Sequence, residues 1–120
     1  ANPRFSPYGQ ASKEFLVNIG VWSKYKDKLV LANNIKQVVS FLYSGNAKNG
    51  FMSFSDKIKF KHNNKGTFLK VSQKMFNNIN QDVILLSRGK NSKYSKKFLS
   101  FLKSKEIKKI IESFGYKIKN

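Results

Sequence analysis

Short apolar runs alternate with amphipathic segments along this chain, and this alternation limits its possible folds more than any other feature. Strand-like runs lie at residues 29–31, 50–54, 67–71 and 83–86, and the last has the composition that parallel sheets bury. Helical patterns occupy residues 8–19 and 35–42, the second following a predicted cap at Asn33. The alternation predicts an α/β fold with a mainly parallel sheet flanked by helices.

Residues 91–120 predict two further amphipathic helices. Apolar side chains recur there at helical spacing, at Phe98, Phe101, Leu102, Ile107, Ile110, Ile111 and Phe114. Gly20 and Gly115 each follow a helical pattern and predict where that helix ends. Residues 21–28 predict a short helix or turn, and residues 56–66 a lysine-rich connection.

The chain is strongly basic. Its 24 basic side chains outnumber 6 acidic ones, which gives a formal net charge of +18. Such a charge attracts anions, nucleic acid or an acidic membrane surface. Lysine, asparagine and phenylalanine are all encoded by AT-rich codons, so genome composition is one explanation of the lysine excess. The charge by itself does not choose among these partners.

Several classes of chemistry are excluded by composition. The chain has no cysteine, so disulfides and thiolate metal sites are absent. The single histidine, His62, lies in a lysine-rich stretch and is interpreted as a solvated side chain, and the six acids are scattered singly. Neither a paired-carboxylate catalytic site nor a cation cage is therefore indicated. We interpret the chain as a binding protein rather than an enzyme.

Two predicted helix starts offer a way to bind an anion without formal charge. One follows Ser6 and Pro7, and the other begins at Asn34 and Ile35. First-turn amides lack intrahelical acceptors, and the helix dipole adds partial positive charge at the same end. Gly9 has no side chain and would let a ligand approach the main chain closely. The two starts together predict an oxyanion site.

Short residue groups in a characteristic order and spacing extend over the whole chain. They are Ala1-Asn2-Pro3, Ser6-Pro7-Tyr8-Gly9, Ala11, Lys13-Glu14, Gly20-Val21-Trp22, Lys28-Leu29-Val30, Asn34-Ile35, Ser44-Gly45-Asn46-Ala47, Gly50-Phe51, Gln81-Asp82, Phe101-Leu102-Lys103-Ser104 and Gly115-Tyr116. In this order they resemble the second lobe and C-terminal part of the periplasmic molybdate-binding proteins of ABC transporters.

The resemblance implies one lobe of a type II periplasmic binding protein, in which two α/β lobes close on a tetrahedral oxyanion such as molybdate or tungstate. It implies neutral hydrogen bonds to that ligand from Tyr8 and Gly9 at the first helix start, and from Asn34 and Ile35 at the second. Ser53 stands where some members supply a tyrosine hydroxyl. No cofactor is implied, and metal is bound only as the oxyanion.

The resemblance also implies partners, a location and a domain organisation. It implies the membrane permease of an ABC transporter as partner, and a periplasmic or cell-envelope location. Residues 1–80 correspond to the second, ligand-binding lobe without its first strand, and residues 81–120 to a crossover strand and helices that would pack on a first lobe. We therefore expect a fragment, a truncated product or a split protein. Its missing N-terminal lobe or a second copy would complete the cleft.

One alternative is a lysine-rich module for nucleic acid or anionic membrane surfaces, in which the lysines of residues 57–74 and 90–109 contact phosphates. The phenylalanines, however, follow periodic apolar faces instead of interleaving with lysines as stacking platforms. Nucleic acid is therefore disfavoured as a partner. A structural remnant that binds no ligand is a third possibility.

Overall fold

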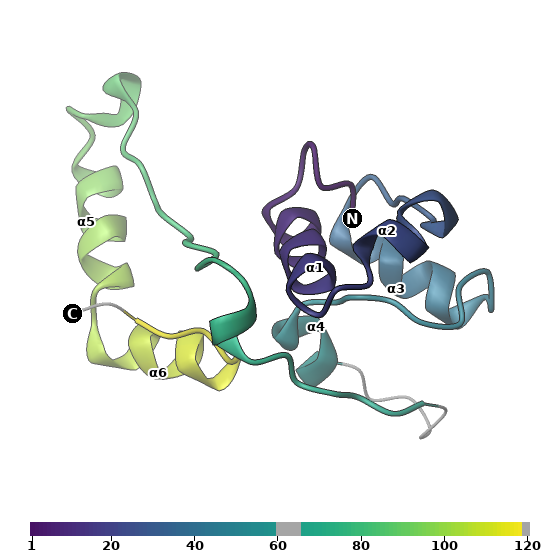
Figure 1. The fold of residues 1–120 in the computed structure, drawn as a ribbon. Helices are drawn as coiled ribbons and strands as arrows, with labels where there is room; N and C mark the ends of the chain where they lie inside the picture. Colours follow the sequence, from purple (N-terminus) through teal and green to yellow (C-terminus); the bar gives the residue numbers. More distant parts are fainter. Residues whose placement is uncertain (60–65, 119–120) are drawn as a thin grey trace. The chain divides into compact units, whose positions relative to one another are not determined.

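The structure is a computed structural model that describes residues 1–59 and 66–118. It divides after Asn80 into two compact parts, the first unit (Ala1–Asn80) and the second unit (Gln81–Asn120). Figure 1 shows the helices of each along the chain. The assignment of these units to the lobes of a two-lobed protein stays a prediction. His62 lies outside the described residues.

Helices dominate the first unit. In chain order they are α1 (Pro7–Asn18), α2 (Trp22–Tyr25), the 3-10 turn η1 (Lys26–Lys28), α3 (Ile35–Tyr43), α4 (Phe54–Lys59) and the 3-10 turn η2 (Gln73–Met75). The predicted end of α1 at Gly20 is confirmed, because this glycine has a φ of 74° and donates to the Val17 carbonyl at 2.9 Å. Glycine adopts this left-handed conformation without a steric cost.

The core of the first unit is small. α1 packs against α2 and η2, and Phe15 of α1 meets Phe51 edge to face, with ring centroids 5.6 Å apart. Ala32 is fully buried, and Val38 of α3 is 8% exposed. Phe15 and Val38 thus turn toward the interior of this unit, whereas Ile19, at the end of α1, is 44% exposed.

Helix α4 was not expected, since its residues were predicted as the end of a strand and a lysine-rich connection. It forms because Ser53 caps its start: the Ser53 Oγ accepts from the Asp56 N–H at 3.0 Å and donates to the Asp56 carboxylate at 2.5 Å. The Ser53 hydroxyl is thus an N-cap that is itself held by the Asp56 carboxylate. The Ser-x-x-Asp spacing at residues 53–56 is the sequence signal that would have predicted it.

The predicted parallel sheet is not formed in residues 1–59 and 66–118, where no segments pair as strands. Residues 67–71 and 83–86 run as irregular chain, and residues 29–32 add one backbone bond, from the Asn2 N–H to the Ala32 carbonyl at 2.9 Å. A strand needs a neighbour along its length to satisfy its backbone groups. Apolar composition indicates that these runs could form strands, but it does not indicate which segment would pair with each of them.

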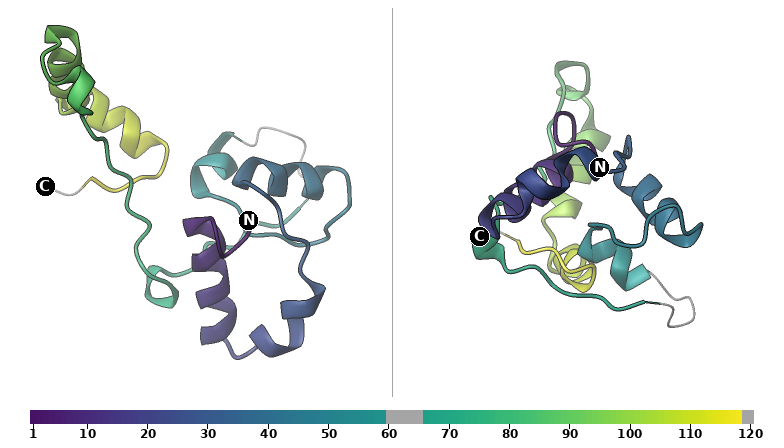
Figure 2. Two further views of the ribbon diagram at one scale, coloured as in Figure 1. Left: turned by 90° about the horizontal axis from the view of Figure 1, so that it is seen from above. Right: turned by 45° about the vertical axis from the view of Figure 1, so that its right-hand side comes forward.

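The second unit contains the 3-10 turn η3 (Ser87–Gly89) and the two predicted C-terminal helices, α5 (Lys93–Leu102) and α6 (Lys105–Ser113). The two helices contact each other and appear in both views of Figure 2. Each begins at a serine whose hydroxyl accepts from the third amide of its helix, as N-caps do. Across the described part of the chain, no helix combines the length and apolar character needed to cross a membrane.

Candidate functional site

Helix α1 starts at a well-formed cap. Ser6 is extended, with φ −129° and ψ 126°, and its Oγ accepts from the Gly9 N–H at 3.4 Å. Pro7 occupies the first helical position, where its missing N–H removes no helical hydrogen bond. Tyr8 is half-buried, and its carbonyl accepts from the Ser12 hydroxyl at 2.7 Å. No acidic side chain lies in the first turn to offset the positive end of the helix dipole.

Gly9 is buried, but the reason differs from the one expected. A Cβ at this position would lie 2.5 Å from the Ala1 carbonyl oxygen and 2.6 Å from the Asn2 carbonyl carbon. The face of Gly9 that lacks a side chain is therefore covered by the chain's own N-terminal dipeptide instead of lying open to a ligand. Among the residues that the structure describes, its N–H donates only the long bond to the Ser6 Oγ.

Helix α3 begins one residue later than predicted, because Asn34 rather than Asn33 is its cap. Asn34 is extended, and its side chain accepts from the Gln37 N–H at 2.9 Å, while the Gln37 side chain accepts from the Asn33 N–H at 2.7 Å. Within residues 1–59 and 66–118, no acceptor receives the Ile35 N–H. Ile35 is half-buried, and the first turn again has no acidic side chain.

The N-terminal dipeptide joins the two helix starts. The Asn2 N–H donates to the Ala32 carbonyl at 2.9 Å, two residues before the cap of α3, and the Asn2 carbonyl accepts from the Ser6 N–H at 3.0 Å. The same dipeptide covers Gly9, and Figures 1 and 2 place the N-terminus beside α1. One short segment thus covers the first turn of α1 and bonds to the chain just before α3.

Ser53 does not join this arrangement through any hydrogen bond in the described residues. It is only 5% exposed, and its hydroxyl contacts Asp56 and lies 3.0 Å from the Ser55 hydroxyl. These contacts hold the start of α4. The prediction that the Ser53 hydroxyl replaces a tyrosine contact to a ligand stays a prediction.

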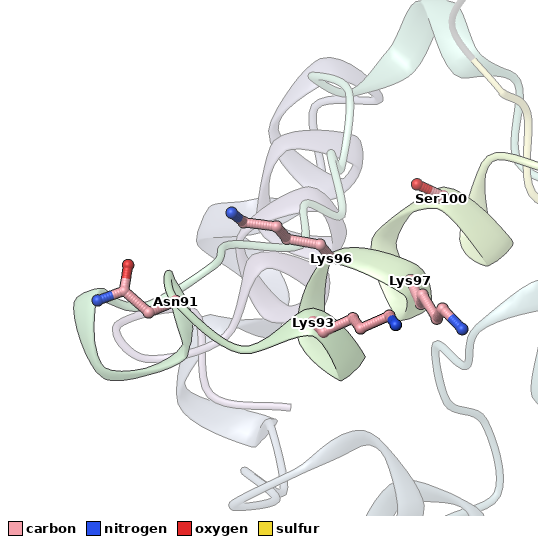
Figure 3. A pocket seen from close by; sticks show the side chains of 5 residues that line it. All are labelled: Asn91, Lys93, Lys96, Lys97 and Ser100. Carbon is pink, nitrogen blue, oxygen red and sulfur yellow. The ribbon is translucent and has the colours of Figure 1, made fainter.

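A separate hollow on the second unit is lined by lysines of α5. Figure 3 shows that Lys93 and Lys97 extend to one side, whereas Lys96 extends toward the other. The ammonium groups therefore do not converge on a single ion. The described residues contain no group of three or more carboxylates or histidines that could hold a metal ion. The joined helix starts of the first unit are the better candidate for a small anion.

Comparison with known proteins relates the chain to one family and to three described proteins. Residues 1–117 match the model of the bacterial extracellular solute-binding protein family. The chain is 35% identical over 116 residues to the molybdate-binding protein ModA of Rhodobacter capsulatus, covering 97% of this chain and 45% of that protein. It is 31% identical over 116 residues to the molybdate-binding protein ModA of Azotobacter vinelandii, covering 97% of this chain and 46% of that protein.

A third relative is a putative lipoprotein. The chain is 29% identical over 114 residues to the putative ABC transporter substrate-binding lipoprotein YvgL of Bacillus subtilis (strain 168), covering 95% of this chain and 43% of that protein. The chain spans less than half the length of each of these curated relatives.

Proposed function

Because the chain belongs to the bacterial extracellular solute-binding protein family, we propose that it forms one side of the oxyanion cleft in the substrate-binding component of an ABC uptake transporter. The family predicted from the ordered sequence motifs is confirmed. Two relatives are molybdate-binding proteins, so molybdate is the first ligand to test and tungstate, a similar tetrahedral oxyanion, is the second. The role is binding, without catalysis and without a cofactor.

The observation that carries this proposal is the joining of two helix starts by one short segment. The Ile35 N–H has no acceptor in the described residues. The Gly9 N–H donates to the Ser6 Oγ at 3.4 Å, which is near the outer limit of a hydrogen bond. An oxyanion would accept from both amides, and Tyr8 and Asn34 would flank it. Neither turn contains a carboxylate that would repel it.

The remaining parts of the proposal follow from the family and from exposed surfaces. The partner would be the membrane permease of the transporter, and the location the periplasm or cell envelope. In the second unit, Phe98 and Phe101 are 56% and 50% exposed, and we propose that this apolar face packs on the other lobe or on a second copy. The diverging lysines of α5 give no support to a nucleic-acid site.

Thermal unfolding of the 120-residue chain tests the ligand. The measurement compares millimolar molybdate, tungstate and sulfate at about 0.3 M salt, where diffuse charge attraction is screened. We expect the unfolding midpoint to rise with molybdate or tungstate more than with sulfate. A cooperative transition whose midpoint is the same in all three anions would contradict the proposal.

A matched pair of variants tests the Ile35 donor. Ile35→Pro removes the amide N–H at the first helical position, where proline is favoured. Asn34 before it is already extended, at φ −149° and ψ 170°, as a residue before proline should be. Ile35→Ala loses a similar part of the side chain and keeps the N–H. We expect Ile35→Pro to abolish the molybdate shift and Ile35→Ala to retain most of it. Equal shifts in both variants would exclude Ile35 as a donor.

A further inference from the structure

One acidic side chain links α1 to a segment far away in the sequence. The Glu14 carboxylate accepts from the Asn77 N–H at 2.7 Å and from the Asn77 side-chain amide at 3.0 Å. Its third contact is the Gln10 side-chain amide, at 3.3 Å. Lys13 and Lys74 line the same hollow, yet the carboxylate's hydrogen bonds go to neutral amides. The positions of the neighbouring amides, and not an opposite charge, therefore determine which groups bind the Glu14 carboxylate.

A second residue of α1 bonds to the same distant segment from the same side of the helix. The Asn18 side-chain amide donates to the Met75 carbonyl at 2.8 Å. Gln10, Glu14 and Asn18 are four residues apart in turn and therefore share one helical face. With residues 75–77 they form what we call the α1 clamp. Within the clamp, Glu14 and Asn18 lie about 7 and about 14 Å along the helix axis from Gly9, at 1.5 Å per residue.

α1 is therefore held at two places along its length. Near its start, Gly9 lies against the N-terminal dipeptide, which also bonds to Ala32, two residues before the α3 cap. Farther along, Glu14 and Asn18 fix it to residues 75–77. A helix held only at Gly9 could tilt about that point, and this would move its first-turn amides relative to those of α3.

We propose that Glu14 is a positioning residue for the proposed oxyanion site, acting through the α1 clamp to hold the first turn of α1 in register with that of α3. The inference rests on the proposed function, because it names a residue that supports the same site. Glu14 itself touches no ligand. Its effect is exerted through the direction of α1 and should appear in ligand affinity as well as in stability.

The test compares Glu14→Gln with Glu112→Gln, which makes the same charge change in the second unit. Asn77→Ala removes the side-chain hydrogen bond to Glu14 and leaves the one from the Asn77 N–H. Molybdate affinity is measured by calorimetry, and amide exchange of Gly9 and Gln10 by NMR, at a temperature where every variant is folded. We expect Glu14→Gln and Asn77→Ala to weaken molybdate binding about 3- to 10-fold, as supporting residues outside a site do, and to speed exchange at Gly9. Glu112→Gln should change neither.

The outcomes separate this inference from the proposed function. If the unaltered chain shows no molybdate binding while its Gly9 exchange still depends on Glu14, the proposed function fails and the clamp is purely structural. If molybdate binds and Glu14→Gln matches Glu112→Gln in both affinity and exchange, the positioning role is wrong. The double variant Glu14→Gln with Asn77→Ala should weaken binding by less than the two single effects combined, since both variants act on the contact between the same two residues.

Discussion

Replacing Gly9 by alanine is the sharpest test of how the two helix starts are joined. The new Cβ would lie 2.5 Å from the Ala1 carbonyl oxygen, and 2.6 and 2.7 Å from the carbonyl carbon and oxygen of Asn2. These are backbone atoms, which cannot rotate away as the end of a flexible side chain can. The N-terminal dipeptide must therefore move.

The size of the effect follows from the bonds that this movement breaks. Asn2 donates to Ala32 and accepts from Phe5 and Ser6, and each such bond contributes about 1 kcal/mol to stability. Alanine in a helix is favoured over glycine by about 1 kcal/mol, which offsets part of the loss. The net decrease in the free energy of unfolding is therefore about 2 kcal/mol.

Urea unfolding followed by the emission of Trp22, the single tryptophan of the chain, measures this decrease. A loss of about 2 kcal/mol lowers the midpoint by about 1 M for a chain of this size. Gly66→Ala is the control, because Gly66 has nothing within 4 Å of its added Cβ, and we expect no loss there. If Gly9→Ala is as stable as the unaltered chain, the close packing of the dipeptide on α1 would be refuted.

The remaining predictions concern pH, capping and association. The hydrogen bonds from the Asn77 backbone and side chain lower the pKa of Glu14. The ionised Glu14 carboxylate therefore stabilises the folded chain above the ordinary carboxyl pKa, and this stabilisation is lost as the pH falls through the lowered pKa. Acid unfolding monitored by Trp22 emission should be less pH-dependent below about pH 5 in Glu14→Gln than in the unaltered chain. Ser53→Ala should lower stability by about 1 to 2 kcal/mol through loss of the α4 cap, while Ser53→Thr keeps most of it, as urea unfolding can show. Phe98→Ser with Phe101→Ser should reduce self-association in sedimentation velocity while α5 stays helical by circular dichroism; unchanged association would exclude this face.

The local sequence predicted helices well where their end signals lie within a few residues. Ser6 and Pro7 mark the start of α1, and Gly20 marks its end, all as expected. The α3 cap was misplaced by one residue because Asn33 and Asn34 are equally good caps. Only the Gln37 side chain, which bonds back to Asn33, decides between them. The α4 start was missed although its capping pair is local.

Pairing between distant segments could not be predicted in the same way. The strand-like runs have the expected composition, but within the described residues none lies along another. Gly9 was predicted to let a ligand approach the main chain, whereas the group that lies against it is the N-terminal dipeptide. Nothing in the sequence near Glu14 indicates that its partner is Asn77, 63 residues away.

The sequence by itself determined the family, the long helices and the two capped turns proposed to bind an oxyanion, because each depends on ordered motifs or on contacts within one helical turn. The tertiary structure alone decided that residues 1–2 cover Gly9 and bond to Ala32, and that Glu14 holds α1 to residues 75–77. Both contacts join segments separated by many residues, and such closures depend on the whole chain's packing and not on local propensity.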